Sequence, residues 1–295
     1  MSSHKHNLVK KCLICKSLTA NDTLHWHKDP DTEEIWVWCQ GKCKRGYSIY
    51  EYCYQAGLSV KELLDLGLNF IEAPEAEVSA MEWSRHFLHL GDQRAKLGLD
   101  YLRSRGLRPA SDMYYDSSRE GIVFAYYYEN TFVGAQIRFL VDKVTEDGDP
   151  WKITTLPGTR LGYLFWGWSQ NPLSSSVKYL VLTEGAFNAA SIQQSLNDHY
   201  GNLLQNPYRC IATSGSGISK YHIDQLKTLI DNGMKIIASP DSDEAGLKML
   251  NKIQLNGACT HYSLVSKDGV DWNDLLKHND EKFVAQEFLS QITRS

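Results

Sequence analysis

The sequence predicts an α/β protein whose C-terminal part is a parallel sheet covered by helices. Strand-like and helical segments alternate from residue 178 onward, which is typical of that architecture. β-rich runs between residues 121 and 155 predict a small mixed α+β lobe, and two close cysteine pairs within residues 12–43 predict an all-β metal-binding module. The expected divisions are 1–68 for the N-terminal module, 69–82 for an acidic linker, 83–176 for the mixed lobe and 177–295 for the parallel-sheet domain.

The composition is that of a protein with a hydrophobic core. The chain has 295 residues, of which 42% are hydrophobic, so it can hold about two or three compact domains. No apolar run approaches the ~20 residues of a membrane helix, and the first residues lack the apolar stretch of a signal peptide. We therefore expect a cytoplasmic protein. The net charge of −4 does not by itself indicate nucleic-acid binding, which needs a local excess of Lys and Arg.

Four of the seven cysteines form two pairs, Cys12 with Cys15 and Cys39 with Cys43, separated by 23 residues. Four thiolates can close a tetrahedral shell around a structural Zn²⁺. The strand-like segments between the pairs, joined by a turn, complete the pattern of a zinc ribbon. The binding energy of the metal would replace the core that roughly 50 residues cannot build.

Two alternatives stay open for this module. A single Cys-x-x-Cys is also typical of redox sites, although the second pair favours zinc. His25 or His27 could replace one cysteine as a ligand. The remaining cysteines, Cys53, Cys210 and Cys259, have apolar neighbours and are expected to be small core residues.

A helical region from Ser79 leads into the expected mixed lobe, with Asp92 as a candidate N-cap and Gly106 as a candidate stop. The strand-like runs of the lobe are 121–128, 132–139, 151–155 and 164–167. The first two are joined by a short polar segment and predict a β-hairpin.

Acidic residues follow two strand-like segments of the parallel-sheet domain. Glu184 follows the run 179–183, and Asp241 and Asp243 follow the run 234–239. Because the carboxyl ends of parallel strands open onto one crevice, we expect these three acids to meet there. Carboxylates without thiol or imidazole neighbours suit Mg²⁺ or Mn²⁺. No Walker A sequence occurs in the chain, so a helicase ATPase is not expected.

Thr183-Glu184-Gly185 and the segment 239–246 resemble the two motifs of the TOPRIM domain, which bacterial-type primases, topoisomerases and some nucleases share. Residues 270–276 are similar to an aspartate-containing segment of phage primases, and residues 98–107 to the segment that opens the primase core. With a cysteine ribbon ahead of it, the arrangement resembles that of bacterial and phage-type DNA primases.

The resemblance implies a DNA-directed RNA polymerase that makes short RNA primers from NTPs on single-stranded DNA by two-metal nucleotidyl transfer. Glu184, Asp241 and Asp243 would be the catalytic residues and, with Asp271, would hold Mg²⁺ or Mn²⁺, while Zn²⁺ would be structural. Glu184 would either join the metal shell or accept a proton. The ribbon would read the template start site, and a separate replicative helicase would be a partner.

The same match implies basic residues that hold the nucleotide and the template. Arg138, Lys152 and Arg160 would bind the triphosphate. In the ribbon and the first helix, aromatic faces would stack on unpaired bases while cations hold the backbone. The expected DNA-binding residues are Trp36, Trp38, Lys42, Lys44, Arg45, Arg103 and Arg105. The alternative is that the tryptophans fill the core of the ribbon and the cations are ordinary surface charges.

One position departs from the primase pattern, and two other functions stay open. Primases carry an aspartate four residues after the motif glutamate, whereas this chain has Asn188, which adds no charge. The cluster would then hold its cations less tightly unless another acid, such as Asp274, compensates. A Mg²⁺-dependent TOPRIM nuclease would use the same acids, and a non-catalytic replication or DNA-binding module would use only the ribbon. A topoisomerase is disfavoured, because the chain has too little length for a separate tyrosine-nucleophile domain.

Overall fold

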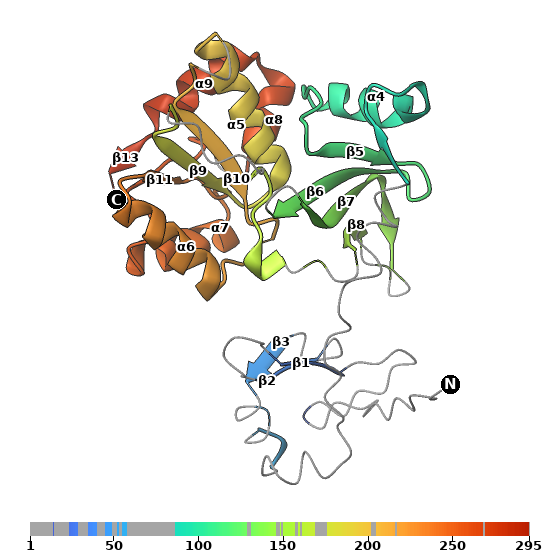
Figure 1. Ribbon diagram of the computed structural model, residues 1–295, viewed down its shortest axis with the longest axis vertical. Helices are drawn as coiled ribbons and strands as arrows, with labels where there is room; N and C mark the ends of the chain where they lie inside the picture. Colours follow the sequence, from blue (N-terminus) through green and yellow to red (C-terminus); the bar gives the residue numbers. More distant parts are fainter. Residues whose placement is uncertain are drawn as a thin grey trace. The chain divides into compact units, whose positions relative to one another are not determined.

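The computed structural model divides the chain into two compact units, Met1–Glu77 and Val78–Ser295 (Figure 1). Within the parts of the chain that it describes, no helix has the length and apolarity of a membrane span. The described residues are 14, 24–28, 35–39, 45–48, 52, 55–57, 86–128, 131–145, 148, 150–156, 159, 161–168, 176–201, 205–215, 217–267 and 269–294.

The N-terminal unit contains a three-stranded antiparallel sheet in the order β1-β2-β3. The strands are β1 (Leu24–Lys28), β2 (Ile35–Cys39) and β3 (Arg45–Ser48). The first two agree with the expected strands, and β3 is an addition to them. Val37 and Tyr47 pair across β2 and β3, and both are buried, as is Cys39. Cys12, Cys15 and Cys43 lie outside the described residues, as does the expected linker, so the zinc site stays a prediction.

The lobe that follows is an antiparallel sheet in the order β4-β5-β6-β7-β8, with one short helix. Its elements are β4 (Phe87–His89), α4 (Lys96–Ser104), β5 (Met113–Asp116), β6 (Gly121–Tyr128), β7 (Thr131–Val144) and β8 (Pro150–Thr155). The predicted hairpin is confirmed, because β6 and β7 pair along their length from Gly121 opposite Phe139 to Tyr128 opposite Thr131. The expected strand-like run 151–155 lies in β8, which pairs with β7.

Two expectations for this lobe are wrong. Residues 87–89 are not helical but pair with β5 as an edge strand, and the helix begins only at Lys96, after the 3₁₀ turn Gln93–Ala95 that Asp92 caps. Gly106 does end this helical stretch, with φ at +72°. The segment 164–167 does not extend the lobe's sheet, because Trp166 forms a bridge with Ala212 of the other sheet.

The parallel-sheet domain has the strand order β10-β9-β11-β12-β13, in which only β13 runs antiparallel to its neighbour. The strands are β9 (Tyr179–Thr183), β10 (Tyr208–Ala212), β11 (Lys235–Ala238), β12 (His261–Tyr262) and β13 (Thr293–Arg294). The helices are α5 (Ala186–His199), α6 (Lys220–Asp231), α7 (Glu244–Leu255), α8 (Trp272–His278) and α9 (Glu281–Ser290).

Helices cover both faces of this sheet, with α5, α8 and α9 on one side and α6 and α7 on the other (Figure 1). Successive residues of a strand point to opposite faces, so both kinds of position must be apolar when both faces are covered. Accordingly Val181 and Ile237 pack in the core that contains α5, whereas Leu182 packs in the core that contains α6 and α7. This arrangement confirms the predicted fold class.

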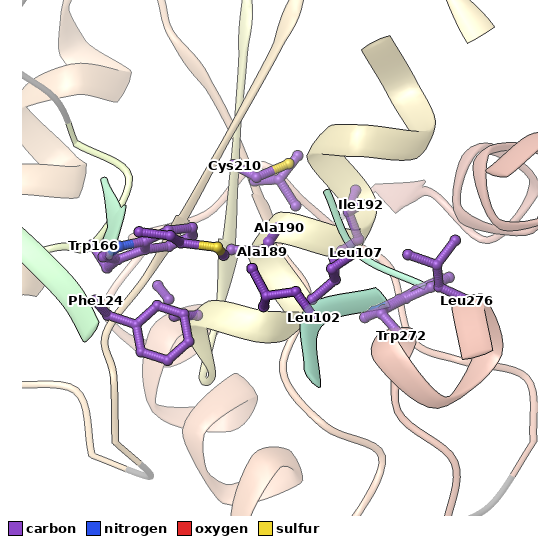
Figure 2. Close-up of a cluster of buried hydrophobic side chains, with 14 of the residues drawn as sticks. Leu102, Leu107, Phe124, Trp166, Ala189, Ala190, Ile192, Cys210, Trp272 and Leu276 are labelled. Carbon is purple, nitrogen blue, oxygen red and sulfur yellow. The ribbon is translucent and has the colours of Figure 1, made fainter. Parts of the chain in front are cut away.

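A shared hydrophobic core joins the mixed lobe to the parallel-sheet domain (Figure 2). Phe124 of β6 packs edge-to-face against Trp166 and against Phe187 of α5, with ring centroids 5.5 and 4.9 Å apart. Leu102 and Leu107, which flank the end of α4, are buried in the same cluster. The contact holds the lobe against the parallel-sheet domain.

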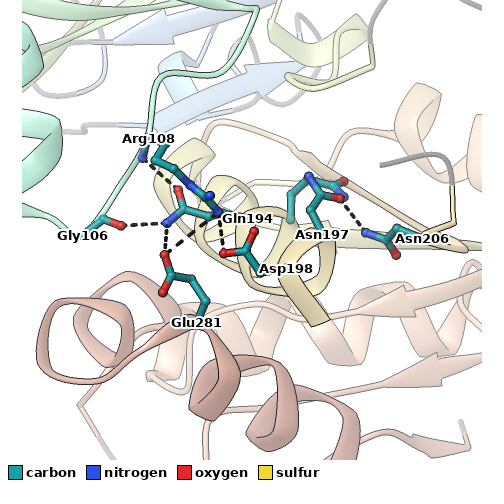
Figure 3. Close-up of polar contacts among 8 residues, drawn as sticks. Gly106, Arg108, Gln194, Asn197, Asp198, Asn206 and Glu281 are labelled. Atoms are coloured by element: carbon teal, nitrogen blue, oxygen red, sulfur yellow. Dashed lines mark hydrogen bonds and ion pairs between the residues drawn. The ribbon is translucent and has the colours of Figure 1, made fainter. Parts of the chain in front are cut away.

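A polar network between α5 and the segment that follows α4 reinforces this contact (Figure 3). The side chain of Gln194 accepts a hydrogen bond from the backbone N–H of Arg108 and donates to the carbonyl oxygen of Gly106, at 2.8 Å in both cases. Arg108 also forms an ion pair with Asp198 at 2.8 Å. The segment after α4 is therefore anchored to α5 by directional bonds as well as by apolar packing.

Candidate active site

Three of the predicted acids line one cavity of about 270 Å³ between the lobe and the parallel sheet. Glu184 follows β9, Asp241 follows β11, and Asp271 is the N-cap of α8. The backbone N–H of Asp241 donates to Oε1 of Glu184 at 3.4 Å, so the two strand ends are in direct contact. The convergence follows from the sheet, because β9 and β11 are adjacent parallel strands whose carboxyl ends lie at one edge.

Asp243, the fourth predicted acid, has a different position. It is exposed, does not line the cavity, and caps α7 by accepting a 2.8 Å hydrogen bond from the backbone N–H of Gly246. Burial is the main cause of the raised pKa values of Glu184 and Asp241, and the negative charge of Asp243 adds to both shifts. We therefore place Asp243 at the rim of the acidic cluster, where one of its oxygens holds the helix start.

Burial and mutual repulsion make the acids of the cavity harder to ionise than free carboxyl groups. Burial, followed by the charge of Asp241, raises the pKa of Glu184 to about 7. Burial, followed by the charge of Asp271, raises the pKa of Asp241 to about 6, and burial also raises the pKa of Asp271. Clustered buried carboxylates of this kind are stabilised in their charged form by a bound cation.

The donor set fits a hard divalent cation. Among the described residues, no three Asp, Glu, His or Cys side chains are grouped closely enough to hold an ion by themselves. Mg²⁺ and Mn²⁺ do not require such a cage, because they take one or two carboxylates and fill the remaining positions with water and substrate phosphates. One or two of the carboxylates of Glu184, Asp241 and Asp271 would therefore hold the ion, and the metal role expected for Asp243 stays a prediction.

Gly246 allows the two strand ends to approach each other. A Cβ atom at this position would overlap the carbonyl oxygen of Asp241 and would lie 2.7 Å from Oε1 of Glu184. No residue with a side chain fits there without moving one of these groups. The glycine that closes the segment 239–246 is therefore part of the site.

Asn188 of α5 lies between Asp241 and the start of α8. Its Nδ2 donates a hydrogen bond to Oδ1 of Asp241 at 2.7 Å, and its Oδ1 accepts one from the backbone N–H of Asn273 at 3.1 Å. Asn188 also lines the cavity. The amide that departs from the primase pattern therefore contacts the predicted metal ligand directly.

Two arginines bring positive charge to the same cavity. Arg138 of β7 forms an ion pair with Asp142 at 2.9 Å, and its Nη1 is buried without a hydrogen-bond partner among the described residues. Arg105, which follows α4, donates to Oδ1 of Asn273 at 2.7 Å, and its guanidinium lies 4.5 Å from the ring centroid of Phe187. Arg105 lies beside the acids, and the DNA contact expected for it stays a prediction.

Among the described residues of this unit, the predicted contacts Lys152 and Arg103 do not line this cavity. Lys152 is exposed on β8, next to Ile153, which does line the cavity. Arg103 is exposed and pairs with Asp100 at 3.5 Å. Trp36 and Trp38 lie in β2 and Arg45 in β3, whereas Lys42, Lys44 and Arg160 lie outside the described residues. The roles expected for all of these residues stay predictions.

Comparison with known proteins identifies the domain that carries the acids. The sequence model of the Toprim-like family matches residues 181–276. We refer to residues 181–276, which are similar to this family, as the Toprim-like domain. None of the curated protein sequences compared with the chain matches it significantly.

The similarity to solved structures covers more of the chain than the Toprim-like domain and includes the mixed lobe. The Aquifex aeolicus primase, solved with its zinc-binding and RNA polymerase domains, is similar with a TM-score of 0.51 and 15% sequence identity, covering 95% of this chain and 81% of that one. A DnaG primase catalytic domain bound to single-stranded DNA is similar with a TM-score of 0.50 and 15% identity, covering 73% of this chain and 78% of that one. At this level of identity the likeness establishes a shared fold.

Several residues that line the cavity were not predicted. Gln136 lies two residues before Arg138 on β7, and strand periodicity could have placed both on one face. Phe187 lies three residues after Glu184, at the start of α5 in the Toprim-like domain, where it supports Arg105. Gln136 donates to the carbonyl oxygen of Ser214 at 2.8 Å, and this long-range contact has no signal in the sequence.

The raised pKa values predict how the stability of the metal-free protein depends on pH. Glu184 and Asp241 have folded-state pKa values of about 7 and about 6, above their ordinary values of 4.5 and 3.8. Between the ordinary and the folded-state pKa of each acid, the folded state binds more protons than the unfolded state. The contribution of the two acids to stability therefore falls as the pH rises through this range. Mg²⁺ needs the ionised carboxylates, so its stabilising effect should grow over the same range.

Melting temperatures measured with EDTA or with Mg²⁺, at about pH 5 and about pH 8, test this expectation. The rise in Tm caused by Mg²⁺ should be larger at the higher pH in the wild-type protein, and Asp241→Asn should remove most of that difference. An equal Mg²⁺ effect at both pH values would show that these acids do not take up the ion.

Proposed function

We propose that the protein is a DNA primase that synthesises short RNA primers on single-stranded DNA by nucleotidyl transfer. The observation that carries the proposal is that one cavity is lined by the acids Glu184, Asp241 and Asp271 and by the cations Arg105 and Arg138. Acids that can hold divalent ions and arginines that can hold phosphates therefore face the same space. This combination suits a reaction between a triphosphate and a hydroxyl group.

In the proposed reaction, the 3′-hydroxyl oxygen of one nucleotide bonds to the α-phosphorus of the next. The bond from that phosphorus to the bridging oxygen breaks, and pyrophosphate leaves. Bound divalent cations would lower the pKa of the hydroxyl group and neutralise charge on the leaving phosphates. Glu184, with a pKa of about 7, is suited to accept the proton from the hydroxyl or to join the metal shell.

Arg138 is the best placed residue to hold the triphosphate. Its guanidinium keeps one buried nitrogen without a hydrogen-bond partner among the described residues, and it lines the same cavity as the acids. Arg105 is held in a fixed orientation by Asn273 and by the ring of Phe187, so it presents its charge at little cost in side-chain entropy. A phosphate in the cavity would face both cations and the acids.

We also propose that the N-terminal unit is a zinc ribbon that reads the template. The spacing of the cysteine pairs, the three antiparallel strands and the burial of Cys39 support the ribbon. Metal analysis should find about one zinc ion per chain. Cys39→Ser should lower the zinc content and the binding of single-stranded DNA, whereas Cys210→Ser, in a buried cysteine of the other unit, should leave both unchanged. Full zinc content in Cys39→Ser would refute the ribbon.

Incubation with single-stranded DNA, labelled NTPs and Mg²⁺ tests the central activity. Labelled oligoribonucleotides are the expected product, and a panel of template triplets would show which start site the ribbon reads. A Toprim nuclease is the second candidate, because the same acids could activate water for phosphodiester hydrolysis. Clipped template without new RNA would establish the nuclease and exclude the primase. The partner expected of a primase is a separate replicative helicase.

A further inference from the structure

Asn188 replaces a charged residue of the primase pattern, and it also forms a hydrogen bond to Asp241. We infer that Asn188 is a positioning residue, which orients the carboxylate of Asp241 before any cation arrives and ties it to the start of α8. The inference rests on the proposed function in taking Asp241 as a cation ligand. It differs from the expectation drawn from sequence, which treated the amide only as a weaker substitute for an acid.

The chemistry of the neighbours allows only one orientation of the Asn188 amide. A carboxylate oxygen accepts hydrogen bonds and a backbone N–H donates them, whereas an amide side chain can do both. The amide nitrogen must therefore face Asp241, at 2.7 Å, and the amide oxygen must face the backbone N–H of Asn273, at 3.1 Å. Asn188 is only 3% exposed, so its amide has little access to bulk solvent.

The bridge continues into a fully buried second amide. Asn273 is 0% exposed, and its Nδ2 donates to the carbonyl oxygen of Arg105 at 3.1 Å and to the hydroxyl of Ser191 at 3.0 Å. Its Oδ1 accepts from Nη1 of Arg105 at 2.7 Å. The hydrogen bonds thus run from Asp241 through two amides to a cation of the same cavity. They link α5, α8 and the end of α4, which are separate elements of the fold.

An aspartate at position 188 would behave differently with and without a cation. Without one, it would place two carboxylates at hydrogen-bonding distance with no proton donor between them, which is unfavourable in a buried site. With one, it would add a negative charge and a further oxygen ligand. Asn188 therefore favours an ordered cation-free site, and an aspartate favours tighter cation binding.

Three variants separate these effects. Asn188→Ala removes both bonds, Asn188→Asp exchanges the donor for a charge, and the double variant Asn188→Asp/Asp241→Asn reverses the donor and acceptor of the same bond without changing the net charge. Asn197→Ala is the matched control, because Asn197 also lies on α5 and bonds to Asn206 at 2.8 Å, away from the acids (Figure 3). The readouts are Mn²⁺ affinity by electron paramagnetic resonance and Tm in EDTA.

Asn188→Ala should bind Mn²⁺ about tenfold more weakly than the wild type, as expected when a residue that orients a ligand is lost. Asn188→Asp should bind Mn²⁺ at least as tightly as the wild type but melt about 3 °C or more lower in EDTA. The double variant should recover most of that Tm, because its carboxylate at position 188 can accept hydrogen bonds from the amide at position 241 and from the backbone N–H of Asn273. Asn197→Ala should keep the wild-type Mn²⁺ affinity.

Unchanged Mn²⁺ affinity in Asn188→Ala would overturn the inference, as would an Asn188→Asp variant that binds no better than Asn188→Ala. A double variant no more stable in EDTA than Asn188→Asp would also overturn it. Failure of the proposed metal site gives a different result, in which the wild type and Asp241→Asn bind Mn²⁺ equally. The EDTA comparison then still decides whether the bond between positions 188 and 241 orders the site.

Discussion

Asp241→Asn is expected to lower primer synthesis by about a thousandfold, because a metal ion contributes several kcal/mol to such a reaction and each 1.36 kcal/mol is tenfold in rate. Asp241 lines the cavity and is in contact with Glu184 and Asn188. Asparagine has nearly the same shape but removes the charge that the cation needs. Binding of single-stranded DNA should change little, because the substitution leaves the ribbon and the arginines intact.

The measurement is the yield of labelled oligoribonucleotides at saturating Mg²⁺, together with template affinity from fluorescence anisotropy. Glu244→Gln is the matched control, because Glu244 is an acid only three residues away that is exposed and paired with Lys248. It should retain wild-type activity. Undiminished synthesis by Asp241→Asn would remove the metal site from the proposal.

Gly246→Ala is expected to produce the second largest effect, on both stability and activity. The added methyl group would overlap the carbonyl oxygen of Asp241 and press on Oε1 of Glu184, at 2.7 Å. The backbone oxygen has little freedom to move, because the neighbouring N–H of Asp241 is bonded to Glu184. Overpacking of this kind costs about 1–3 kcal/mol, which corresponds to a fall in Tm of several degrees.

Thermal unfolding of Gly246→Ala, followed by primer synthesis below its Tm, tests this expectation. Gly91→Ala is the control, because no atom lies within 4 Å of a Cβ built at Gly91. The control should melt and react as the wild type does. Wild-type behaviour in Gly246→Ala would mean that the two strand ends are not as close as the structure places them.

The convergence of the acids could be predicted because it depends on short-range signals. Glu184 and Asp241 each follow an apolar run, and parallel strands bring such ends together whatever the details of packing. Strand pairing does not determine what each carboxylate binds. Asp243 caps α7 instead of lining the cavity, because the backbone N–H groups at a helix start compete for the nearest acceptor.

The features that could not be predicted from the sequence depend on contacts between distant segments. The edge strand β4 exists because Phe87–His89 pairs with β5, and a three-residue run gives no periodic signal. Arg105 reaches the cavity through Asn273, 168 residues away in sequence. The partners of Asn188 likewise come from the end of β11 and the start of α8. Sequence spacing reveals the residue types of such a site but not their hydrogen bonds.

The position of bound Mn²⁺ in crystals, located by its anomalous scattering, tests the central claim most directly. An anomalous peak is expected in the cavity, within coordination distance of carboxylate oxygens of Glu184 and Asp241. This peak should be lost in crystals of Asp241→Asn. Ordered Mn²⁺ at other positions with none in this cavity, in a protein that still makes primers, would contradict the central claim.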